Sequence, residues 1–466
     1  MKTSQRFFLF QGDEARLKLV HGILGSRATF AFKSFLAVVF MVLPFRVLGQ
    51  ETYPIGLGWA RTKVNTVIFR HHAVCTFGQI QVAAYYDQDG RVVLAHRTLD
   101  SSKWDLHITP YRGRTEDAHN SISIAFDGKG RLHMSWNHHG SSLNYCRATA
   151  PGSIELGPKE SIVGNFEDRV TYPEFVNLPS GDLLLFYRSG GSGDGNLVLD
   201  FYNAQTESWH RLHDNLIDGE GQRNAYWQVA CGKTGHLHLS WVWRETPDVI
   251  TNHDICYAVS KDSGRTWQTT DGRRYELPIN QDTAEYAVRI PQDSELANQT
   301  SMAVDADDHP VIANFWRTDG ESVPQYRLVL FDGERWRVQQ IGTRTLDFHR
   351  QGGGTKSPPV SRPLVLINSD TQPSPTYVLF RDLELGGGIT VARATDPLAN
   401  NWTFEQLTPG PVGQSDPLVD VSLWNSQRKI HLFSQYAGQG DYETQVEVEP
   451  QMVSVIEWRP QANPPR

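Results

Sequence analysis

The sequence predicts an all-β fold, a seven-bladed β-propeller, on three observations. Its 466 residues include 13 Trp, 16 Tyr, 21 Phe and 39 Gly, a composition typical of short aromatic-rich strands joined by tight turns. Periodic stretches rich in Ala, Leu, Glu and Lys are nearly absent after residue 50, so we expect very little helix. A hairpin pattern also recurs along the chain, and the number of its copies sets the number of blades.

The repeated unit is an alternating strand, a turn of the Asp/Gly type, and a second alternating strand that ends in aromatic residues. Clear copies occupy residues 121–139, 174–190, 228–245 and 301–319, and weaker copies occupy 81–98, 361–382 and 420–436. Seven hairpins at intervals of roughly 40 to 70 residues, with further strands between them, are typical of propeller blades around a central channel. A pair of β-sandwiches is the main alternative fold.

Two segments outside the hairpins support the same architecture. Residues 260–267 (SKDSGRTW) match the S-x-D-x-G-x-x-W turn, the Asp box, that decorates the blades of sialidase-like propellers. One convincing copy indicates architecture and says nothing of chemistry. The strand at residues 452–458 (MVSVIEW) is expected to pair with blade one, which would close the ring and remove its open edges. We expect residues 51–466 to form a single propeller domain.

The first 50 residues differ from the rest of the chain. Residues 35–45 (FLAVVFMVLPF) form an apolar run behind Arg27 and Lys33. A bilayer-spanning helix needs about 20 residues, so this shorter run is more typical of a secretory signal. We therefore predict a leader over residues 1–50 and a secreted or periplasmic protein without stable membrane insertion. A membrane tether through the apolar run is the alternative.

Charge and cysteine content restrict the partners. The net charge is −8 and no basic run occurs, which argues against nucleic acid. A local cluster of Arg and His can still reverse the field inside one cleft, so an acidic substrate remains compatible with this charge. The four cysteines do not form the dense pattern of a disulfide framework. We expect a monomer.

The hairpin repeat predicts which side chains share a face. In a blade the innermost strand runs from one face to the other and the second strand returns, so the residues before the first strand and after the second lie together. A hairpin takes about 16 to 20 residues. His119 and His139 flank the hairpin of blade two and are 20 residues apart, while Tyr172 and Arg188 flank that of blade three and are 16 residues apart.

The equivalent positions of blades four and five carry aromatic, amide and guanidinium groups, which suit carbohydrate binding. With the neighbour of His139 included, the predicted substrate-binding residues are His138, Tyr226, Trp227, Trp243, Arg244, Asn298, Trp316 and Arg317.

Each candidate catalytic residue also has an ordinary structural explanation. A His at a strand end is commonly a hydrogen-bonded turn residue. Tyr172 could cap a strand beside Pro173, and Arg188 could pair with Asp182 or Asp194. The four candidates together, at hairpin spacing in adjacent blades, favour a functional site. The small-residue loop that follows Arg188 leaves room for a polymer.

Four motifs carry a family resemblance. D-A-H-N at 117–120, W-N-H-H-G at 136–140, T-Y-P-E-F at 171–175 and F-Y-R-S-G at 186–190 resemble the BNR-repeat polysaccharide lyase group. That group includes the ulvan lyases of polysaccharide lyase families 24 and 25 and related rhamnose–glucuronate lyases. The resemblance runs from about residue 60 onward and implies a seven-bladed propeller that cleaves a uronic-acid-containing polysaccharide by β-elimination. It also implies that His119, His139, Tyr172 and Arg188 form the active site.

The residue types suit that reaction. The proton α to a carboxylate becomes acidic only when the carboxylate charge is neutralised, which a bidentate Arg188 with His139 can do. His119, with an ordinary pKa of about 6.5, is available as the base, and Tyr172, with an ordinary pKa of about 10, can donate a proton to the leaving oxygen. For an iduronate, Tyr172 could serve as both base and acid. No catalytic metal or other catalytic cofactor is expected.

A structural zinc site is the one cofactor that we predict. His253 and Cys256 lie three residues apart, and the resemblance implies a structural zinc, for which Asp194 is the available third ligand. A buried free cysteine is the alternative, because a three-residue offset on a strand points two side chains to opposite faces.

Two other functions remain open. Arg188, Arg244 and Arg317 could form the arginine cluster of a sialidase-like glycosidase, and VRIP at 288–291 resembles a sialidase signature. That signature belongs near the first blade, however, and a Tyr/Glu nucleophile pair and repeated Asp boxes are missing. The second alternative is a non-catalytic glycan-binding propeller.

Overall fold

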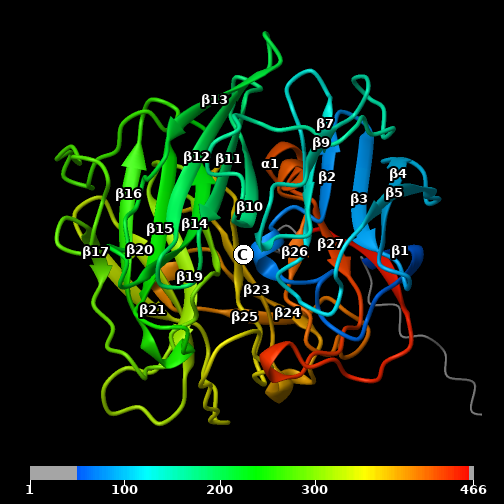
Figure 1. The fold of residues 1–466 in the computed structure, drawn as a ribbon. Helices are drawn as coiled ribbons and strands as arrows, with labels where there is room; N and C mark the ends of the chain where they lie inside the picture. Colours follow the sequence, from blue (N-terminus) through cyan, green and yellow to red (C-terminus); the bar gives the residue numbers. More distant parts are fainter. Residues whose placement is uncertain (1–49, 461–466) are drawn as a thin grey trace, which may run out of the picture. The chain divides into compact units, whose positions relative to one another are not determined.

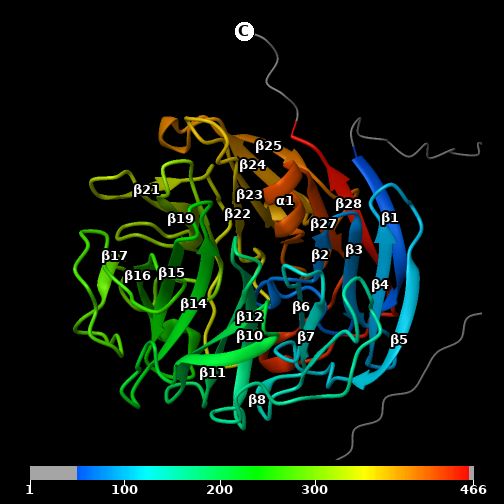
Figure 2. The ribbon, with the colours of Figure 1, turned by 90° about the horizontal axis from the view of Figure 1, so that it is seen from above.

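The computed structural model describes residues 50–460. Seven antiparallel sheets follow one another around a ring, and within the described residues only one α-helix occurs (Figures 1 and 2). The predicted seven-bladed β-propeller is therefore confirmed. The predicted leader lies outside the described residues except for Gln50, which opens the first strand. No helix within residues 50–460 is long and apolar enough to cross a membrane.

Blades one to three come from the first half of the chain. Blade one contains β2 (Val74–Phe77), β3 (Ile80–Tyr86), β4 (Arg91–Thr98) and β5 (Asp105–Arg112). Blade two contains β6 (Ile122–Phe126), β7 (Leu132–Trp136) and β9 (Tyr145–Arg147). Blade three contains β10 (Val170–Asn177), β11 (Leu183–Ser189), β12 (Asn196–Asn203) and β13 (Ser208–His213), and the short β8 (His139–Ser141) adds to the β10 side of the same sheet.

Blades four to seven complete the ring. Blade four contains β14 (Asn224–Cys231), β15 (Leu237–Arg244), β16 (Asn252–Ser260) and β17 (Glu285–Val288). Blade five contains β18 (Ser301–Val304), β19 (Pro310–Trp316), β20 (Gln325–Phe331) and β21 (Trp336–Gln340). Blade six contains β22 (Leu364–Ile367), β23 (Thr376–Arg381), β24 (Ile389–Ala394) and β25 (Thr403–Gln406). Blade seven contains β26 (Leu418–Val419), β27 (Ile430–Ser434), β28 (Gln451–Trp458) and β1 (Gln50–Gly58).

The ring closes differently from the prediction. The strand at 452–458 does not pair with blade one; as β28 it pairs with β27 and with β1, so the start of the described chain supplies the outermost strand of blade seven (Figure 2). The physical reason is that the segment after blade six provides only three strands, β26, β27 and β28, so the last sheet takes its fourth strand from β1. Backbone hydrogen bonds from Gln50↔Trp458 to Gly58↔Gln451 thus join the two ends of the described chain.

The seventh hairpin also departs from the repeat. The predicted copy at 420–436 begins with α1 (Val421–Gln427) rather than with a strand. The carboxylate of Asp420 caps this helix by accepting a hydrogen bond from the Leu423 amide (2.9 Å), which satisfies a free donor at the helix start. Leu423 and Trp424 bury the inner side of the helix. Short 3-10 turns occur at η1 (Ile68–Arg70), η2 (Val249–Thr251), η3 (Leu383–Leu385), η4 (Pro397–Ala399) and η5 (Asp441–Glu443).

The Asp box forms the expected turn after β16. Asp262 accepts hydrogen bonds from the Thr266 amide (2.8 Å) and from the Ser260 hydroxyl (2.9 Å), and the indole of Trp267 donates to the Gly264 carbonyl (3.0 Å). Trp267 is buried with Trp227, Trp241 and Trp243 in the core around blade four. All four cysteines are free thiols, so no disulfide supports the fold.

The direction of the inner strands sets where a site can form. β6, β10 and β14 begin near His119, Tyr172 and Tyr226 and end beside a cavity of about 580 Å³ that lies at the opposite end of the channel. The cavity lining includes Phe126, Leu178, Val229, Val304, Ile367 and Trp424. The predicted catalytic residues thus belong to the face where these strands start.

Loss of packing in β1 should weaken the ring. Ile55 is buried among side chains of blades one and seven, whereas Leu57, two residues on, is 51% exposed. We expect Ile55→Ala to lower the free energy of unfolding by about 2 to 4 kcal/mol, as measured by urea denaturation, while Leu57→Ala changes it by less than about 0.5 kcal/mol. Equal effects of the two substitutions would contradict the role of β1 in ring closure.

Candidate active site

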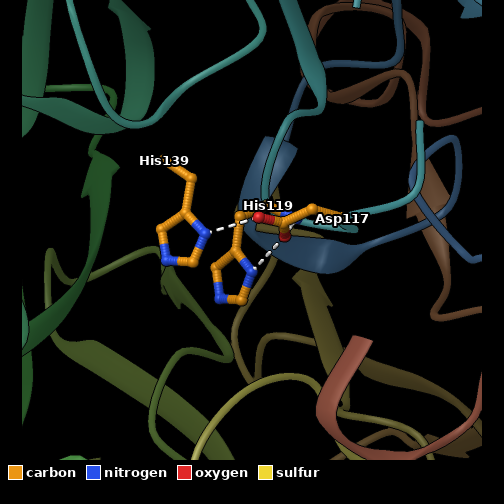
Figure 3. Close-up of side chains that lie close together, drawn as sticks. All are labelled: Asp117, His119 and His139. Atoms are coloured by element: carbon orange, nitrogen blue, oxygen red, sulfur yellow. Dashed lines mark hydrogen bonds and ion pairs between the residues drawn. The ribbon is translucent and has the colours of Figure 1, made fainter. Parts of the chain in front are cut away.

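A carboxylate joins the two predicted histidines. Asp117, in the turn before β6, lies 2.7 Å through Oδ1 from Nδ1 of His119 and 2.6 Å through Oδ2 from Nδ1 of His139. The two imidazole rings stack with centroids 4.0 Å apart and planes 14° from parallel. Figure 3 shows that both rings turn Nδ1 toward Asp117 and their other ring nitrogen away from it. This arrangement fixes the orientation of both rings and leaves the Nε2 edges for a ligand.

Strand β10 places three predicted residues side by side. Thr171 pairs with Arg188 of β11 on one side and with His139 of β8 on the other. The Thr171 hydroxyl also accepts a hydrogen bond from the Gly140 amide (2.8 Å). His139 and Arg188 therefore both lie at the start of β10, where Tyr172 follows Thr171. This is the placement that the hairpin spacing predicts.

Tyr172 lies inside β10 rather than before it. The pairing of β10 with β11 shifts between Thr171 and Glu174, and Tyr172 has a φ of 57°, a left-handed conformation that non-glycine residues seldom adopt. A bulge of this kind re-aims a side chain that a regular strand would point elsewhere. Here the ring of Tyr172 packs edge-on against Phe69 (5.0 Å) and lies 5.7 Å from the His119 ring.

Arg188 is a buried cation without a carboxylate partner. Its residue is 3% exposed, no acidic oxygen among the described residues forms an ion pair with it, and its Cζ lies 5.1 Å from the centre of the Tyr172 ring. With the Asn224 amide oriented to satisfy both neighbours, its oxygen accepts from Nη1 of Arg188 (3.1 Å). Gly195 makes this placement possible, because a Cβ there would come within 2.5 Å of Arg188 Cδ.

Arg244 brings a second guanidinium to the cluster, and both it and Arg188 lie near the Tyr226 ring. Arg244, also buried, lies 5.4 Å from the Tyr226 ring centre and its Nη1 donates to the Tyr226 hydroxyl (3.4 Å). Its other donors meet the carbonyls of Thr246 and Pro247. The Tyr226 ring lies 6.0 Å from that of Tyr172. Blades two, three and four thus contribute two imidazoles, two phenols and two guanidiniums to one place.

The charge states of the two histidines differ. Burial opposes protonation of His119, but the carboxylates of Asp117 and Glu443, which contact its Nδ1 at 2.7 and 3.2 Å, raise its pKa above the ordinary value. Burial and the neighbouring His119 lower the pKa of His139. Burial works against the ionised form of Asp117, yet hydrogen bonds from both histidines hold the pKa of its carboxyl well below the usual range. His119 therefore favours the imidazolium form and His139 the neutral form.

The two phenols differ in the same way. Burial raises the pKa of Tyr172, against the opposing effect of His119, Arg188 and Arg244, so it remains protonated at neutral pH. Burial also disfavours the ionised form of Tyr226, but Arg244 and Arg188 outweigh it and lower the pKa of Tyr226 to about 7. Tyr172 is thus the phenol that stays protonated at neutral pH.

Several predicted substrate-binding residues do not reach this cluster. His138 is fully buried, and its Nε2 accepts a hydrogen bond from the Asn144 amide (2.8 Å). Trp243 is fully buried against Trp241, and Trp316 is buried beneath Arg327. The structure does not bring these three side chains to the cluster; for Trp243 and Trp316 the reason is strand alternation, because neighbouring residues on a strand point to opposite faces.

The remaining predicted binding residues take mixed positions. Trp227 contacts Tyr172 edge-on (6.1 Å) but is buried, and its indole donates to Glu174 (3.1 Å), so it supports the site from the core. Asn298 accepts a hydrogen bond from Arg362 (2.9 Å), and Arg317 donates to the carbonyl of Asp293 (2.6 Å). Of the eight predicted residues, Tyr226 and Arg244 therefore join the cluster directly.

The predicted zinc ligands are not brought together. His253 contacts Glu245 (2.7 Å) and Asp254 (3.1 Å), Cys256 is a buried free thiol on β16, and Asp194 accepts from the Gly191 amide (2.6 Å) in the loop of blade three. The groups of metal-ligating atoms that converge within residues 50–460 do not include this set. His253 is instead held by the two carboxylates that it contacts, and Cys256 lies further along β16, buried opposite Trp241.

Two other groups bring three donor atoms within 4.8 Å of one another. One is Asp117 with His119 and His139, where hydrogen bonds explain the close approach. The other comprises Asp305, Asp307 and His309, a surface turn in which Asp305 accepts from two backbone amides. We assign neither group as a metal site.

Sequence reasoning missed four residues of the cluster. Asp117 lies two residues before His119 within the D-A-H-N motif, so its spacing was a usable signal. Phe69, Asn224 and Glu443 carried no signal, because the fold brings them to His119, Tyr172 and Arg188 from other parts of the chain.

Comparison with known proteins places the chain in a family. Residues 80–344, more than half of the chain, match the BNR repeat-containing family. The chain belongs to this family. An ulvan lyase of Nonlabens ulvanivorans is 21% identical over 264 residues, which cover 49% of this chain and 55% of that protein. A long-isoform ulvan lyase of Alteromonas sp. (strain LOR) is 50% identical over 46 residues, or 10% of this chain and 4% of that protein.

Solved structures share the fold. Polysaccharide lyase Uly1 superposes with a TM-score of 0.61 at 17% identity, covering 88% of this chain and 92% of the other. A PL25 ulvan lyase bound to -[GlcA(1-4)Rha3S]- superposes with a TM-score of 0.62 at 12% identity, covering 87% and 95%. The chain thus spans about half the length of the Nonlabens relative in sequence, while the propeller is shared almost throughout.

Removal of the Asp117 charge should change both histidines. In Asp117→Asn, we expect the pKa of His119 to fall by roughly 1 to 2 units because an adjacent anion is lost. Titration of the imidazole signals by NMR measures this shift. The matched control is Asp100→Asn, at an exposed surface carboxylate. An unchanged His119 titration in Asp117→Asn would contradict the hydrogen bonding described above.

Proposed function

We propose that this protein is a polysaccharide lyase that cleaves a uronic-acid-containing, ulvan-like polymer by β-elimination between C4 and C5 of the uronate. The observation that carries the proposal is the buried Arg188 guanidinium, which lacks a carboxylate partner among the described residues and lies beside Tyr172. A buried charge without a partner is costly, and proteins retain one where a ligand supplies the counter-charge. A uronate carboxylate is such a ligand.

The first step is neutralisation of that carboxylate. Arg188 can grip two oxygens at once through its planar guanidinium. The imidazolium form of His119 adds a second positive charge close by, and Arg244 with Tyr226 lies behind. Withdrawal of charge from the carboxylate makes the proton on C5 more acidic, which is the requirement for elimination.

The second step is removal of the C5 proton, for which His139 is the better candidate. Its Nδ1–H is held by Asp117, so the lone pair of the neutral ring lies on Nε2, away from that carboxylate. His119, held as a cation, has no lone pair to offer. The charge states therefore exchange the roles that the sequence predicted: His139 acts as base, and His119 joins Arg188 in neutralising the carboxylate.

Tyr172 completes the reaction as the acid. As the C5–H bond breaks, its electron pair forms the C4=C5 double bond and the C4–O4 bond breaks with O4 taking up the phenolic proton. The proton gained by His139 then returns to the Tyr172 phenolate directly or through solvent. The reaction consumes no water, and His139 as base and Tyr172 as acid account for the protons removed and donated.

The setting of the enzyme follows from the same proposal. The relatives are ulvan lyases, and an acidic polysaccharide is too large to enter a cell intact, so we propose that the chain acts outside the cytoplasm as a monomer, with residues 1–50 as its leader. Glucuronate and iduronate are both compatible substrates, because the proposed cluster recognises the carboxylate.

The product distinguishes this function from the alternatives. Incubation with ulvan and with other uronate polymers should produce a C4=C5 unsaturated uronate, seen as new ultraviolet absorbance without net hydrolysis. Release of reducing sugar without new absorbance would overturn the lyase in favour of a glycosidase. Retention on the polymers without any product would instead indicate a glycan-binding propeller.

The role of Tyr172 has a direct test. We expect Tyr172→Phe to lower kcat by a factor of about 10² to 10⁴, because general acid catalysis contributes this much, while binding of the polymer is largely retained. The control is Tyr111→Phe, which removes a hydroxyl bonded to the Gly157 carbonyl outside the site. Full activity of Tyr172→Phe in the absorbance assay would refute the acid assignment.

Substitution of Arg188 tests whether its buried charge serves substrate binding or the stability of the fold. Because no carboxylate of the described residues pairs with the guanidinium, we expect Arg188→Met to abolish turnover and polymer binding while the free energy of unfolding stays the same or rises by about 1 kcal/mol. Arg344→Met, which breaks the buried ion pair with Asp382 (2.6 Å), should lower it by about 3 kcal/mol. Equal destabilisation by both substitutions would show that Arg188 is structural.

A further inference from the structure

A glutamate in the loop between β27 and β28 of blade seven also contacts His119 at Nδ1. Glu443, at the end of η5 between β27 and β28, places Oε1 3.2 Å from His119 Nδ1. Oε1 also accepts a hydrogen bond from the Thr355 amide (2.6 Å), and Oε2 accepts one from the Ala118 amide (3.1 Å). One carboxylate therefore contacts the segment before blade two, the connection before blade six and the candidate active site.

The backbone is shaped to hold this glutamate in place. Tyr442 and Glu443 both adopt left-handed conformations, with φ of 59° and 63°, which carry a strain that surrounding contacts must offset. The Tyr442 amide donates to the Thr355 carbonyl (3.0 Å), and the Lys356 ammonium lies 3.5 Å from the centre of the Tyr442 ring. Gly354 permits the close packing, because a Cβ there would approach Tyr442 Cα to 3.0 Å.

The contact between Glu443 and His119 provides a second carboxylate where the two histidines otherwise share one. Asp117 is shared by both imidazoles through its two oxygens. A single shared carboxylate balances one positive charge, and His139 draws on it as well. Glu443 supplies the second anion on the Nδ1 side of His119, and although burial opposes its ionised form, His119 holds the pKa of the Glu443 carboxyl below the ordinary value.

The other groups that face His119 act from its remaining sides. His139 stacks on one face of the ring, and Phe69 packs at 5.4 Å. Tyr172 lies at 5.7 Å, and Tyr226 lies beyond it under the influence of Arg188 and Arg244. Glu443 is therefore the one acidic group besides Asp117 that contacts Nδ1 of His119 within the described residues.

We propose that Glu443 is a positioning residue that, with Asp117, clamps His119 through Nδ1 and holds it as the cation that receives the substrate carboxylate. The inference rests on the proposed lyase function and adds to it a residue from the opposite end of the chain. Glu443 takes part in no bond change; it acts through the orientation and charge of His119.

The test is Glu443→Gln, which keeps the shape of the side chain and removes its charge. Loss of the anion lowers the pKa of His119, so the imidazolium is lost at a lower pH. The alkaline limb of the kcat/KM profile should therefore move to lower pH by roughly 1 unit, with a fall in kcat/KM of about 10-fold at pH 8. Glu443→Asp should restore part of the shift, and Glu447→Gln, at an exposed residue of the same loop, should change nothing.

Two results would overturn the proposal. One is a Glu443→Gln profile with the same alkaline limb as the wild type. The other is a loss of activity that follows a loss of thermal stability, since a merely structural glutamate would produce that pattern. NMR titration of His119 keeps the test independent of activity: if the wild type cleaves no uronate polymer, the lyase function fails, but an unchanged His119 pKa in Glu443→Gln is what refutes the clamp.

Discussion

The pairing of β1 with β28 is the constraint on which the rest of the molecule depends. It joins the two ends of the described chain in one sheet, and with the ring closed the loop between β27 and β28 of blade seven contacts the segment before blade two. The contact between Glu443 and the His119 segment, which spans 325 residues of sequence at Ala118, exists only in that closed state. Closure therefore does more than remove open strand edges; it assembles the site from distant segments.

The hairpin repeat made much of the site predictable. A two-strand excursion returns to the face where it began, so the spacings within blades two and three were enough to place His139, Tyr172 and Arg188 together. Which side chains of a strand reach the cluster depends on strand register, which is hard to read from the sequence. Tyr226 reaches the cluster while its neighbour Trp227 enters the core, and Trp243 and Trp316 likewise lie inside, because a one-residue step along a strand reverses the side chain.

Features that arise from tertiary contacts could not be predicted in this way. The bulge at Tyr172 is a local departure from the pattern that the prediction assumed, and α1 replaces a strand because Asp420 caps a helix there. The contact of Glu443 with His119 has no local signature at all. The proposed zinc ligands depend on tertiary contacts in the same way: His253 contacts Glu245 and Asp254, Cys256 is a buried free thiol, and the converging donor groups of the described residues do not include them.

The arrangement of charges makes the proposed acidic substrate compatible with a chain of net charge −8. Two buried guanidiniums and one imidazolium lie within one cluster, and the two carboxylates that contact the imidazolium lie on its Nδ1 side. Those anions keep His119 protonated but stand behind the ring, where they do not compete for Arg188. The anions that compensate the imidazolium thus lie on its Nδ1 side, and the local field of the cluster, rather than the net charge, is what an acidic substrate of the proposed kind would meet.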